Sequence, residues 1–383
     1  MLGLRPTAAE AVVPVDCPLT ALDAVSAVEA ELGRVLDTTL RRAFDVDEVF
    51  AQDVAGRVTA FVRRGGKRLR SAFAWCGWRA AGGSGDPTAL LRTAAALELV
   101  QACALIHDDV MDGSEFRRGA PAVHVELAHM HRAERLTGSA EAFSTSVAVL
   151  AGDLALVWAD DVLTETALGS PHGPRLFQEW QAMRTEMVAG QYRDIHAQAA
   201  GSSGLDEAVG IATLKSALYT VERPLALGAS LTGGDEPTLS ALRSAGRCAG
   251  LAFQLRDDLL GTYGDPNMTG KPADDDLRTR KLTYLLAVGL WLADAAGDEE
   301  AGDALGPVTD DVGIRSGDAV NRMRAALERT GARDVVESKI SELAATSVRH
   351  FAGATPDPVV RREFTMLVER ASGVALGHTG EAA

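Results

Sequence analysis

Apolar residues recur along most of this chain at intervals of three and four positions, the spacing that places them on one face of a helix. Between residues 21 and 40, such a series runs from Leu22 through Val28 and Leu32 to Leu40. No segment shows the alternation of apolar and polar residues that is typical of a strand. The spacing predicts helices over residues 21–40, 46–63, 69–80, 89–110, 140–168, 176–200, 208–231, 240–260 and 281–296, with several more toward the C-terminus.

Glycine-rich segments separate these predicted helices and have the composition of turns. They are residues 81–87, 169–174, 200–204, 232–237 and 264–272. None is long enough to separate two hydrophobic cores, and no fixed-period repeat is present. We therefore expect one large all-helical domain over residues 21–383, with residues 1–20 as a flexible N-terminal tail. We expect the acidic, glycine-rich stretch 297–317 to be an exposed loop.

The composition is that of an ordinary globular protein, because 46% of the 383 residues are apolar and 24% are charged. Aromatic residues make up only 5%, so the core must consist of Ala, Leu and Val, as in packed helices. The 53 acidic and 38 basic residues give a formal charge of −15. This balance argues against binding to nucleic acid, which requires a basic surface. It permits phosphate ligands, because carboxylates can hold divalent metals that in turn bind phosphates.

The four cysteines, at positions 17, 76, 103 and 248, are scattered and form no CxxC pair. This spacing gives neither a zinc knuckle nor a disulfide framework, and it favours a reducing cytoplasm. The longest apolar runs are interrupted by charge or too short for the ~18 consecutive apolar residues of a membrane-spanning helix. We therefore expect a soluble, cytoplasmic protein.

Three aspartates close a predicted apolar helix in the segment ALIHDDVMDGSEFRRGAP, residues 104–121. Asp108 and Asp112 are four positions apart and so lie on one face, with Asp109 alongside. Such crowded carboxylates repel one another unless cations lie between them, and they suit Mg²⁺, which completes its shell with water and phosphate oxygens. A solvated helix end has the same pattern, but the apolar run before it favours an interior cleft. The adjacent guanidiniums of Arg117 and Arg118 suit a phosphate-bearing anion.

A second acidic doublet, Asp257 and Asp258, closes another predicted apolar helix in FQLRDDLLG, residues 253–261. Two such helix ends facing one cavity would bind several divalent ions. Downstream, Lys271 and Lys281 supply positive charge suited to a lid over a bound polyanion. The aspartates at positions 274 and 275 fit plain loop acids equally well.

The most basic segment of the chain is RRGGKRLR, residues 63–70, at a Gly-Gly turn that leads into a predicted helix. Backbone amides at a helix N-terminus, together with Lys67 and Arg70, make a phosphate site, although a solvated basic turn has the same composition. The ATP-binding pattern GxxxxGK[ST] is absent, because Phe61 stands at its first glycine and Arg68 where Ser or Thr belongs. An ATP-binding loop is therefore not expected.

In this order, the motifs resemble those of the polyprenyl diphosphate synthase family of trans-prenyltransferases, and geranylgeranyl diphosphate synthases in particular. GGKRLR resembles the family's GGKRxRP, with Ser71 in place of the usual proline. HDDVMD followed by RRG resembles the first aspartate-rich motif, and FQLRDD resembles the second, in which Gly261 replaces the third aspartate of DDxxD. GQYRDI (190–195), KSALYTVERPLALGA (215–229), and the later GK, DL and KLT segments continue the match, which spans residues 65–286.

The resemblance implies an all-α helical bundle of the isoprenoid synthase type, with a central cavity for the Mg²⁺-dependent, head-to-tail condensation of an allylic diphosphate with isopentenyl diphosphate. It implies three Mg²⁺ ions on the allylic diphosphate, held by Asp108, Asp109, Asp112, Asp257 and Asp258. It assigns to the allylic diphosphate Arg117, Lys215, Lys271 and Lys281. It assigns to isopentenyl diphosphate Gly66, Lys67, Arg70 and Arg118, with help from Gln101 and His107. Gln191, Ser216 and Gln254 would turn oxygen dipoles toward the carbocation, and released pyrophosphate would take the proton.

Two further expectations concern chain length and assembly. Ala104 lies one turn deeper than Asp108, with Cys103 beside it and Val100 and Leu97 deeper still. Because the small side chains of Cys103 and Ala104 leave room for a growing tail above a floor of Val100 and Leu97, we expect the twenty-carbon product, with a farnesyl or longer product as the alternative. We also expect a homodimer, because residues 147–159 are apolar on most sides and need more burial than one core offers.

Three other classes of protein share parts of this pattern. A class I terpene cyclase has a DDxxD helix, but its second motif differs from FQLRDD and it has no use for GGKRLR. An HD-type phosphohydrolase needs histidine ligands upstream of His107, and none occurs there. A regulatory partner of a prenyltransferase would have lost the aspartates, which are intact. We expect His124, His129 and His131 to serve packing or the surface.

Overall fold

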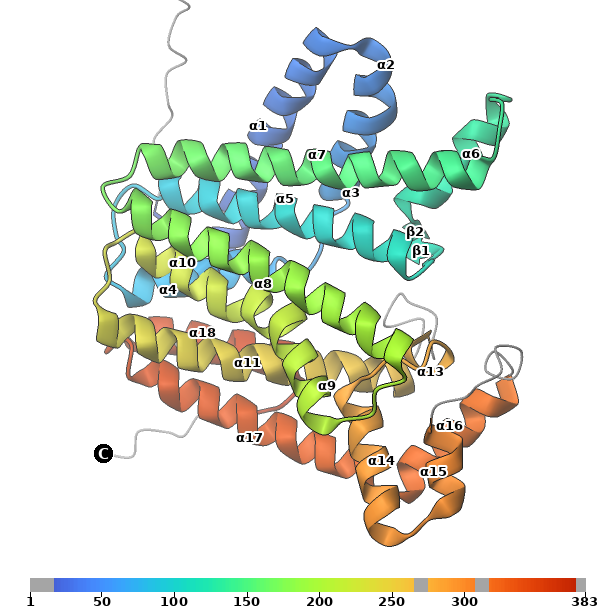
Figure 1. Ribbon diagram of the computed structural model, residues 1–383. Coiled ribbons are helices and arrows are strands. Elements are labelled where there is room, and N and C mark those ends of the chain that lie inside the picture. The colour runs from blue at the N-terminus through green and yellow to red at the C-terminus, as the bar shows by residue number, and fades with distance from the viewer. Residues whose placement is uncertain (1–16, 265–274, 307–316, 377–383) are drawn as a thin grey trace, which may run out of the picture.

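The computed structural model describes residues 17–264, 275–306 and 317–376 as a stack of long helices (Figure 1). The helices and strands of the first half, in chain order, are α1 (Ala21–Val46), α2 (Glu48–Phe50), the π-helix η1 (Ala51–Ala55), α3 (Gly56–Arg63), α4 (Leu69–Ala80), α5 (Thr88–Met111), β1 (Phe116–Arg117), β2 (Ala120–Pro121), α6 (Val123–Ala133) and α7 (Ala140–Leu168). The predicted all-α fold is confirmed for this part of the chain.

The second half continues the stack below α7 and α5 (Figure 1). Its helices are α8 (Gly173–Ala200), α9 (Leu205–Ala212), the π-helix η2 (Thr213–Glu222), α10 (Arg223–Ser230), α11 (Glu236–Tyr263), α13 (Asp275–Arg278), α14 (Tyr284–Ala296), α15 (Glu299–Leu305), α16 (Gly317–Arg329), α17 (Ala332–Ala352) and α18 (Pro358–Ser372). Side-chain caps mark several helix starts, such as Thr20 before α1, Asp235 before α11 and Asp357 before α18.

One hydrophobic cluster runs through most of these helices and is built mainly from Ala, Leu and Val, as the composition predicts. In it, α5 packs along α7, while α11 packs against η2 and α17. Small residues permit the close contact of α4 with α10: a Cβ added at Gly228 would lie 1.9 Å from the carbonyl oxygen of Ala74. These contacts fix the C-terminal ends of α5 and α11, where both aspartate doublets lie.

The structure differs from the sequence expectations in five places. The predicted helix 46–63 is divided among α2, η1 and α3, and the predicted helix 208–231 among α9, η2 and α10. The expected loop 297–317 contains α15, and α6 was not predicted. The expectation of no strands is wrong at β1 and β2, a two-residue antiparallel hairpin. Arg118 and Gly119 turn it with φ of 54° and 73°, the positive values that a tight hairpin turn requires.

Residues 1–16 of the expected tail lie outside the described residues, and the single-domain boundary at residue 21 stays a prediction. Within the described part of the chain, α5 and α7 are long and apolar enough to cross a membrane by length and composition alone. The most apolar window of α5 is 72% buried, as expected of a core helix, whereas that of α7 is only 39% buried. The fold thus leaves an apolar face of α7 uncovered.

Candidate active site

One cavity of about 980 Å³ lies where the C-terminal ends of α5 and α11 meet η2, α8 and the loop before α4. Within the described part of the chain, the site residues predicted above line this cavity, Gln101 included, with the exceptions of Asp109 and His107. These lining residues are Gly66, Lys67, Arg70, Gln101, Asp108, Asp112, Arg117, Arg118, Gln191, Lys215, Ser216, Gln254, Asp257, Asp258 and Lys281. Lys271 lies outside the described residues, so its role stays a prediction.

The acidic cluster of this cavity comprises Asp108 and Asp112 on α5, Asp257 and Asp258 on α11, and Asp276 on α13. The negative charge of these carboxylates exceeds the positive charge beside them. Burial raises the pKa of Asp258 to about 8, and the neighbouring charges of Asp276 and Asp257 add to that rise. Burial also raises the pKa of Asp112. Additional positive charge at this cluster would therefore stabilise the protein.

Two lysines supply part of that positive charge. Both of them form ion pairs with Asp194, a buried residue of α8. Lys215 Nζ lies 2.7 Å from Asp194 Oδ2 and 3.2 Å from Asp108 Oδ1. Lys281 Nζ lies 3.3 Å from Asp194 Oδ2 and 3.6 Å from Asp112 Oδ2. Burial opposes ionisation of Asp108, but Lys215, Lys281 and Arg117 outweigh it and lower its pKa. The two lysines thus lie beside the carboxylates of the first aspartate motif.

The acidic cluster fits hard divalent cations such as Mg²⁺. Asp108, Asp112 and Asp257 line the cavity, and burial together with the charges of Asp276 and Asp257 raises the pKa of Asp258 to about 8. Within the described residues, no three His, Cys, Asp or Glu side chains are grouped tightly enough to hold one ion by themselves. A Mg²⁺ ion here would therefore complete its shell with water and diphosphate oxygens, as this ion commonly does.

Asp109 has a different position from the one predicted. Its carboxylate is only 1% exposed, and its Oδ1 accepts a hydrogen bond of 2.8 Å from Arg117 Nε. The same guanidinium lies 3.5 Å from Asp108 Oδ2. Asp109 therefore orients Arg117 instead of facing the cavity, and its predicted role as a metal ligand gains no support from this placement.

The basic cluster comprises Gly66, Lys67 and Arg70 around the start of α4, together with Arg118 from the hairpin turn. A Cβ at Gly66 would lie 3.1 Å from an Arg118 guanidinium nitrogen, so the glycine lets that side chain approach the loop. Arg70 donates a 2.9 Å hydrogen bond to Thr220 Oγ1. Burial lowers the pKa of Arg118, and the nearby charges of Arg68 and Arg117 contribute. Cations crowded in this way favour binding of an anion.

Polar side chains from α8, η2 and α11 line the space between the clusters. Gln191 Nε2 donates to Asp108 Oδ1 at 3.3 Å, and Gln254 Nε2 donates to Asp258 Oδ1 at 2.7 Å. With both amide nitrogens engaged by carboxylates, the amide oxygens are the groups left to face a substrate. Ser216 lines the cavity from η2. A π-helix places side chains differently from an α-helix, and such segments are frequent at functional sites.

Sequence reasoning missed several lining residues. Asp194 stood inside the quoted GQYRDI segment, and Tyr219, whose hydroxyl donates to Gln101 Oε1 at 2.7 Å, stood inside KSALY. Asp276 is a further case: a Cβ added at Gly261 would lie 2.9 Å from its Oδ2. The glycine that departs from the motif therefore lies where the carboxylate of Asp276 enters the cluster. The DL segment of the motif resemblance distinguished Asp276 from the aspartates beside it, but gave it no role in the site.

Two expectations about α5 are corrected by the structure. His107, proposed to help bind isopentenyl diphosphate, does not line the cavity: its Nε2 lies 3.0 Å from the carbonyl oxygen of Val149 on α7. Cys103 is also absent from the cavity lining, and its Sγ lies 3.7 Å from His107 Nδ1. Ala104 does line the cavity. Of the two positions expected to govern tail length, the structure therefore retains Ala104.

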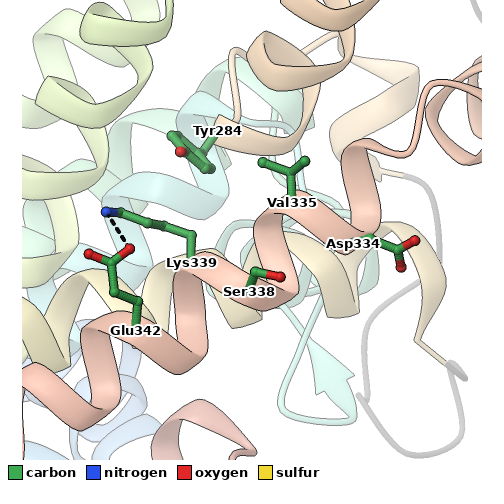
Figure 2. Close-up of a pocket in the computed structure, with 6 residues that line it drawn as sticks. All are labelled: Tyr284, Asp334, Val335, Ser338, Lys339 and Glu342. Carbon is green, nitrogen blue, oxygen red and sulfur yellow. Dashed lines mark hydrogen bonds and ion pairs between the residues drawn. The ribbon is translucent and has the colours of Figure 1, made fainter.

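A second hollow, of about 410 Å³, lies on the outer surface between α14 and α17 (Figure 2). Its lysine, Lys339, lies 2.9 Å from Glu342, so the two charges neutralise each other. Apart from Tyr284, which also lines the main cavity, it contains none of the residues above. We therefore assign the chemistry to the main cavity.

His131, one of three histidines expected to serve packing or the surface, is buried against Phe143 with ring centroids 5.1 Å apart.

Comparison with known proteins gives consistent matches. The polyprenyl synthetase family model matches residues 52–314. The crystal structure of geranylgeranyl pyrophosphate synthase from Corynebacterium glutamicum, complexed with isoprenyl diphosphate and magnesium, has a TM-score of 0.84 and 39% sequence identity. That match covers 91% of this chain and 97% of the other.

The curated relatives of this chain are named for products of different chain lengths. The (2E,6E)-farnesyl diphosphate synthase of Mycobacterium tuberculosis is 35% identical over 250 residues, which cover 62% of this chain. This chain spans only 64% of the length of that relative. The geranylfarnesyl diphosphate synthase of Aeropyrum pernix is 28% identical over 289 residues, which cover 75% of this chain and 83% of that protein. The relatives therefore agree on the family and leave the product length open.

Proposed function

The chain belongs to the polyprenyl synthetase family, which confirms the resemblance of its motifs, and from this premise we propose that it joins an allylic diphosphate head-to-tail to isopentenyl diphosphate. The observation that carries the proposal is one cavity with two unlike charge clusters. The acidic cluster suits a diphosphate that arrives with divalent cations, and the basic cluster suits a diphosphate bound directly. Such a pair of sites matches a reaction between two diphosphate esters.

In this proposal, Asp108, Asp112 and Asp257 hold Mg²⁺ ions on the allylic diphosphate, three ions in all, with Asp258 in support. When bound, the metal supplies Lewis-acid neutralisation of the leaving pyrophosphate. Lys215 and Lys281 lie against the same carboxylates and would turn to the diphosphate oxygens as these arrive. Arg117, oriented by Asp109, would contact the same group.

The basic cluster would hold isopentenyl diphosphate through Lys67, Arg70, Arg118 and the backbone of Gly66. Holding both substrates in one cavity supplies the proximity that bond formation needs. The oxygens of Gln191, Gln254 and Ser216 would face the allylic carbocation and stabilise its charge. No side-chain base is required, because the released pyrophosphate can accept the proton.

The decisive experiment measures pyrophosphate release with Mg²⁺ from dimethylallyl diphosphate, alone and with isopentenyl diphosphate. Condensation predicts release only with both substrates, together with a longer prenyl product. Release from an allylic diphosphate alone, with a cyclic product, would indicate a terpene cyclase. No release from either mixture would contradict both enzymatic functions.

For the product, we propose the twenty-carbon geranylgeranyl diphosphate. Ala104 lines the cavity one turn deeper than Asp108, and its methyl group leaves space for a tail. Product chromatography tests this, with Ala104→Phe expected to shorten the main product to fifteen carbons. Cys103→Phe is the matched comparison, because Cys103 packs toward His107. A fifteen-carbon product from the wild type would contradict the proposal.

We further propose that the protein is a cytoplasmic homodimer and that a second copy covers α7. The exposed apolar side chains of this helix include Leu150 and Val157, which are 57% and 54% exposed. A symmetric pair would bury the same face in both copies. Light scattering should then give twice the 40.2 kDa mass of one chain, and Leu150→Arg should lower it. A wild-type mass of one chain at micromolar concentration would contradict the dimer.

A further inference from the structure

Arg68 differs from the other cations around the basic cluster because carboxylates already neutralise it. Its side chain is buried, and its Nε and Nη1 lie 2.6 Å and 2.7 Å from carboxylate oxygens of Glu29 and Glu98, respectively. Its Nη2 also donates to the carbonyl oxygen of Val62 at 3.1 Å. Burial opposes the charge of Arg68, but the two glutamates outweigh it and raise its pKa.

Lys67, Arg70 and Arg118 are in the opposite situation. None of them forms an ion pair with a carboxylate of the described residues; Arg70 instead bonds Thr220, and its guanidinium lies 4.1 Å from the ring centre of Tyr219. No carboxylate in the described part of the chain therefore neutralises these three cations before a ligand binds. The guanidinium of Arg68, in contrast, forms its hydrogen bonds with groups of the protein itself. The sequence RRGGKRLR contains both kinds of residue without distinguishing them.

The backbone at Arg68 is held in an unfavourable conformation. Its φ is 48°, in the left-handed region that residues with a Cβ seldom adopt, and the residue immediately precedes the first turn of α4. Such a conformation persists only where surrounding contacts enforce it. The ion pairs to Glu29 and Glu98 provide that enforcement. Lys67 directly precedes this turn and Arg70 follows it by two residues, so the placement of both depends on it.

Ser71 joins the same network through Glu98. Its hydroxyl donates to Glu98 Oε1 at 2.8 Å, while Oε2 of the same carboxylate accepts from Arg68. Glu98 is only 5% exposed and lies on α5, ten residues before Asp108, or about 15 Å along the helix. The network therefore connects the basic loop with the helix that carries the first aspartate motif. A proline at position 71, as is usual in the family motif, could not donate this bond.

We propose that Arg68 and Ser71, both acting through Glu98, are positioning residues that set the basic cluster against α5 for the binding of isopentenyl diphosphate. The inference rests on the proposed function and adds to it two residues that need not touch the substrate. Loss of either residue should weaken the isopentenyl diphosphate site and leave the allylic site, built from α5, η2 and α11, largely unchanged.

The experiment compares wild type with Arg68→Lys, Ser71→Ala and the matched control Arg63→Ala. Arg63 belongs to the same basic segment, but its ion pair with Asp37 is half exposed. Calorimetry measures binding of isopentenyl diphosphate, and kinetics give the KM of each substrate. We expect isopentenyl diphosphate to bind about 10-fold more weakly in Arg68→Lys, about 3-fold more weakly in Ser71→Ala and within about 2-fold of wild type in Arg63→Ala. The allylic KM should change less than about 2-fold in all three.

The inference is overturned if the variants bind isopentenyl diphosphate as wild type does, or if both KM values rise equally. Thermal unfolding of each variant identifies a misfolded protein. If Arg68→Lys does not fold, Ser71→Ala still tests the inference, because it removes only one hydrogen bond. A wild type that neither binds isopentenyl diphosphate nor releases pyrophosphate would overturn the proposed function together with this inference. A wild type that does both while the variants match it would overturn the positioning role alone.

Discussion

The acidic and basic clusters share one cavity, but they differ in how their charges are balanced before any substrate arrives. In the acidic cluster, lysines already lie on the carboxylates: Lys215 on Asp194 and Asp108, Lys281 on Asp194 and Asp112. Burial, with the neighbouring charges of Asp276 and Asp257 in addition, raises the pKa of Asp258 to about 8. This cluster must gain cations before it can accept an anion.

The basic cluster has the reverse balance. Burial and neighbouring cations lower the pKa of Arg118, so this cluster favours an anion without any metal. Under the proposed function, this difference means that the two diphosphates would be bound in different ways, one through metal ions and one through guanidinium and ammonium groups. Each prediction below tests one side of that difference.

The largest effect is expected from the acidic cluster. Asp108→Asn or Asp112→Asn removes a charge that Mg²⁺ requires, and we expect kcat to fall by about 1,000-fold or more. The fold should persist, because both side chains face the cavity. Steady-state kinetics with thermal unfolding measure the two effects, and Asp294→Asn on the exposed surface of α14 is the control. Mg²⁺-dependent turnover equal to wild type would refute the assignment of the acidic cluster.

Removal of metal should separate the two diphosphates. With a chelator present, we expect binding of an unreactive allylic diphosphate analogue to weaken by about 100-fold, because the acidic cluster then repels it. Binding of isopentenyl diphosphate should change less than about 3-fold, because its partners carry their own positive charge. Calorimetry with and without Mg²⁺ measures both. Equal losses for the two ligands would mean that the clusters do not act separately.

The sequence predicted the elements that carry both clusters because its helical spacing is local information. Asp108 and Asp112 share a face of one helix, so their side chains had to lie together wherever that helix packed. The roles of Asp194 and Arg68 were not predictable in this way, because they depend on Lys215, Lys281 and Glu29, which come from other elements.

Adjacent doublets show the same limit more clearly. Asp108 and Asp109 have one local pattern, yet the first faces the cavity and the second is buried against Arg117. Ser71 stands where the family motif has a proline, and nothing local indicated that its hydroxyl contacts Glu98 on α5. A helical pattern fixes which face a residue occupies but not which partner meets that face.

Substitution of the two adjacent arginines should affect different properties, namely substrate binding for Arg118 and the stability of the fold for Arg117. Arg118→Ala removes a cation of the basic cluster, and we expect the KM for isopentenyl diphosphate to rise about 10- to 100-fold with an unchanged fold. Arg117→Ala removes the guanidinium partner of the buried Asp109, which should cost about 3 kcal/mol of unfolding free energy. Kinetics and denaturant unfolding of both variants measure this contrast. If Arg118→Ala changed only the allylic KM, the two diphosphate sites would have to be exchanged.

The smallest effect concerns the proton on Asp258. Its pKa is about 8 in the folded protein and near its ordinary 3.8 when unfolded, so the folded state binds more protons between these values. The contribution of this group to stability is therefore greatest below pH 4 and is lost as pH rises to about 8. Asp258→Asn has no such proton. Without metal, its melting temperature relative to wild type should rise by a few degrees, on the order of 2–4 °C, from pH 5 to pH 8.

A comparison with and without Mg²⁺ tests whether Asp258 belongs to the proposed metal-binding cluster. A divalent ion favours the ionised carboxylate, so saturating Mg²⁺ should remove the relative rise in melting temperature between pH 5 and pH 8. It should also release protons on binding at pH 7, which calorimetry in two buffers of different ionisation enthalpy would detect. Arg118 belongs to the basic cluster and its substitution leaves Asp258 in place, so Arg118→Ala should follow wild type at each pH. If the melting curves of wild type and Asp258→Asn ran parallel from pH 5 to pH 8 without metal, Asp258 would be ionised throughout. The acidic cluster would then have no shortage of cations for Mg²⁺ to relieve.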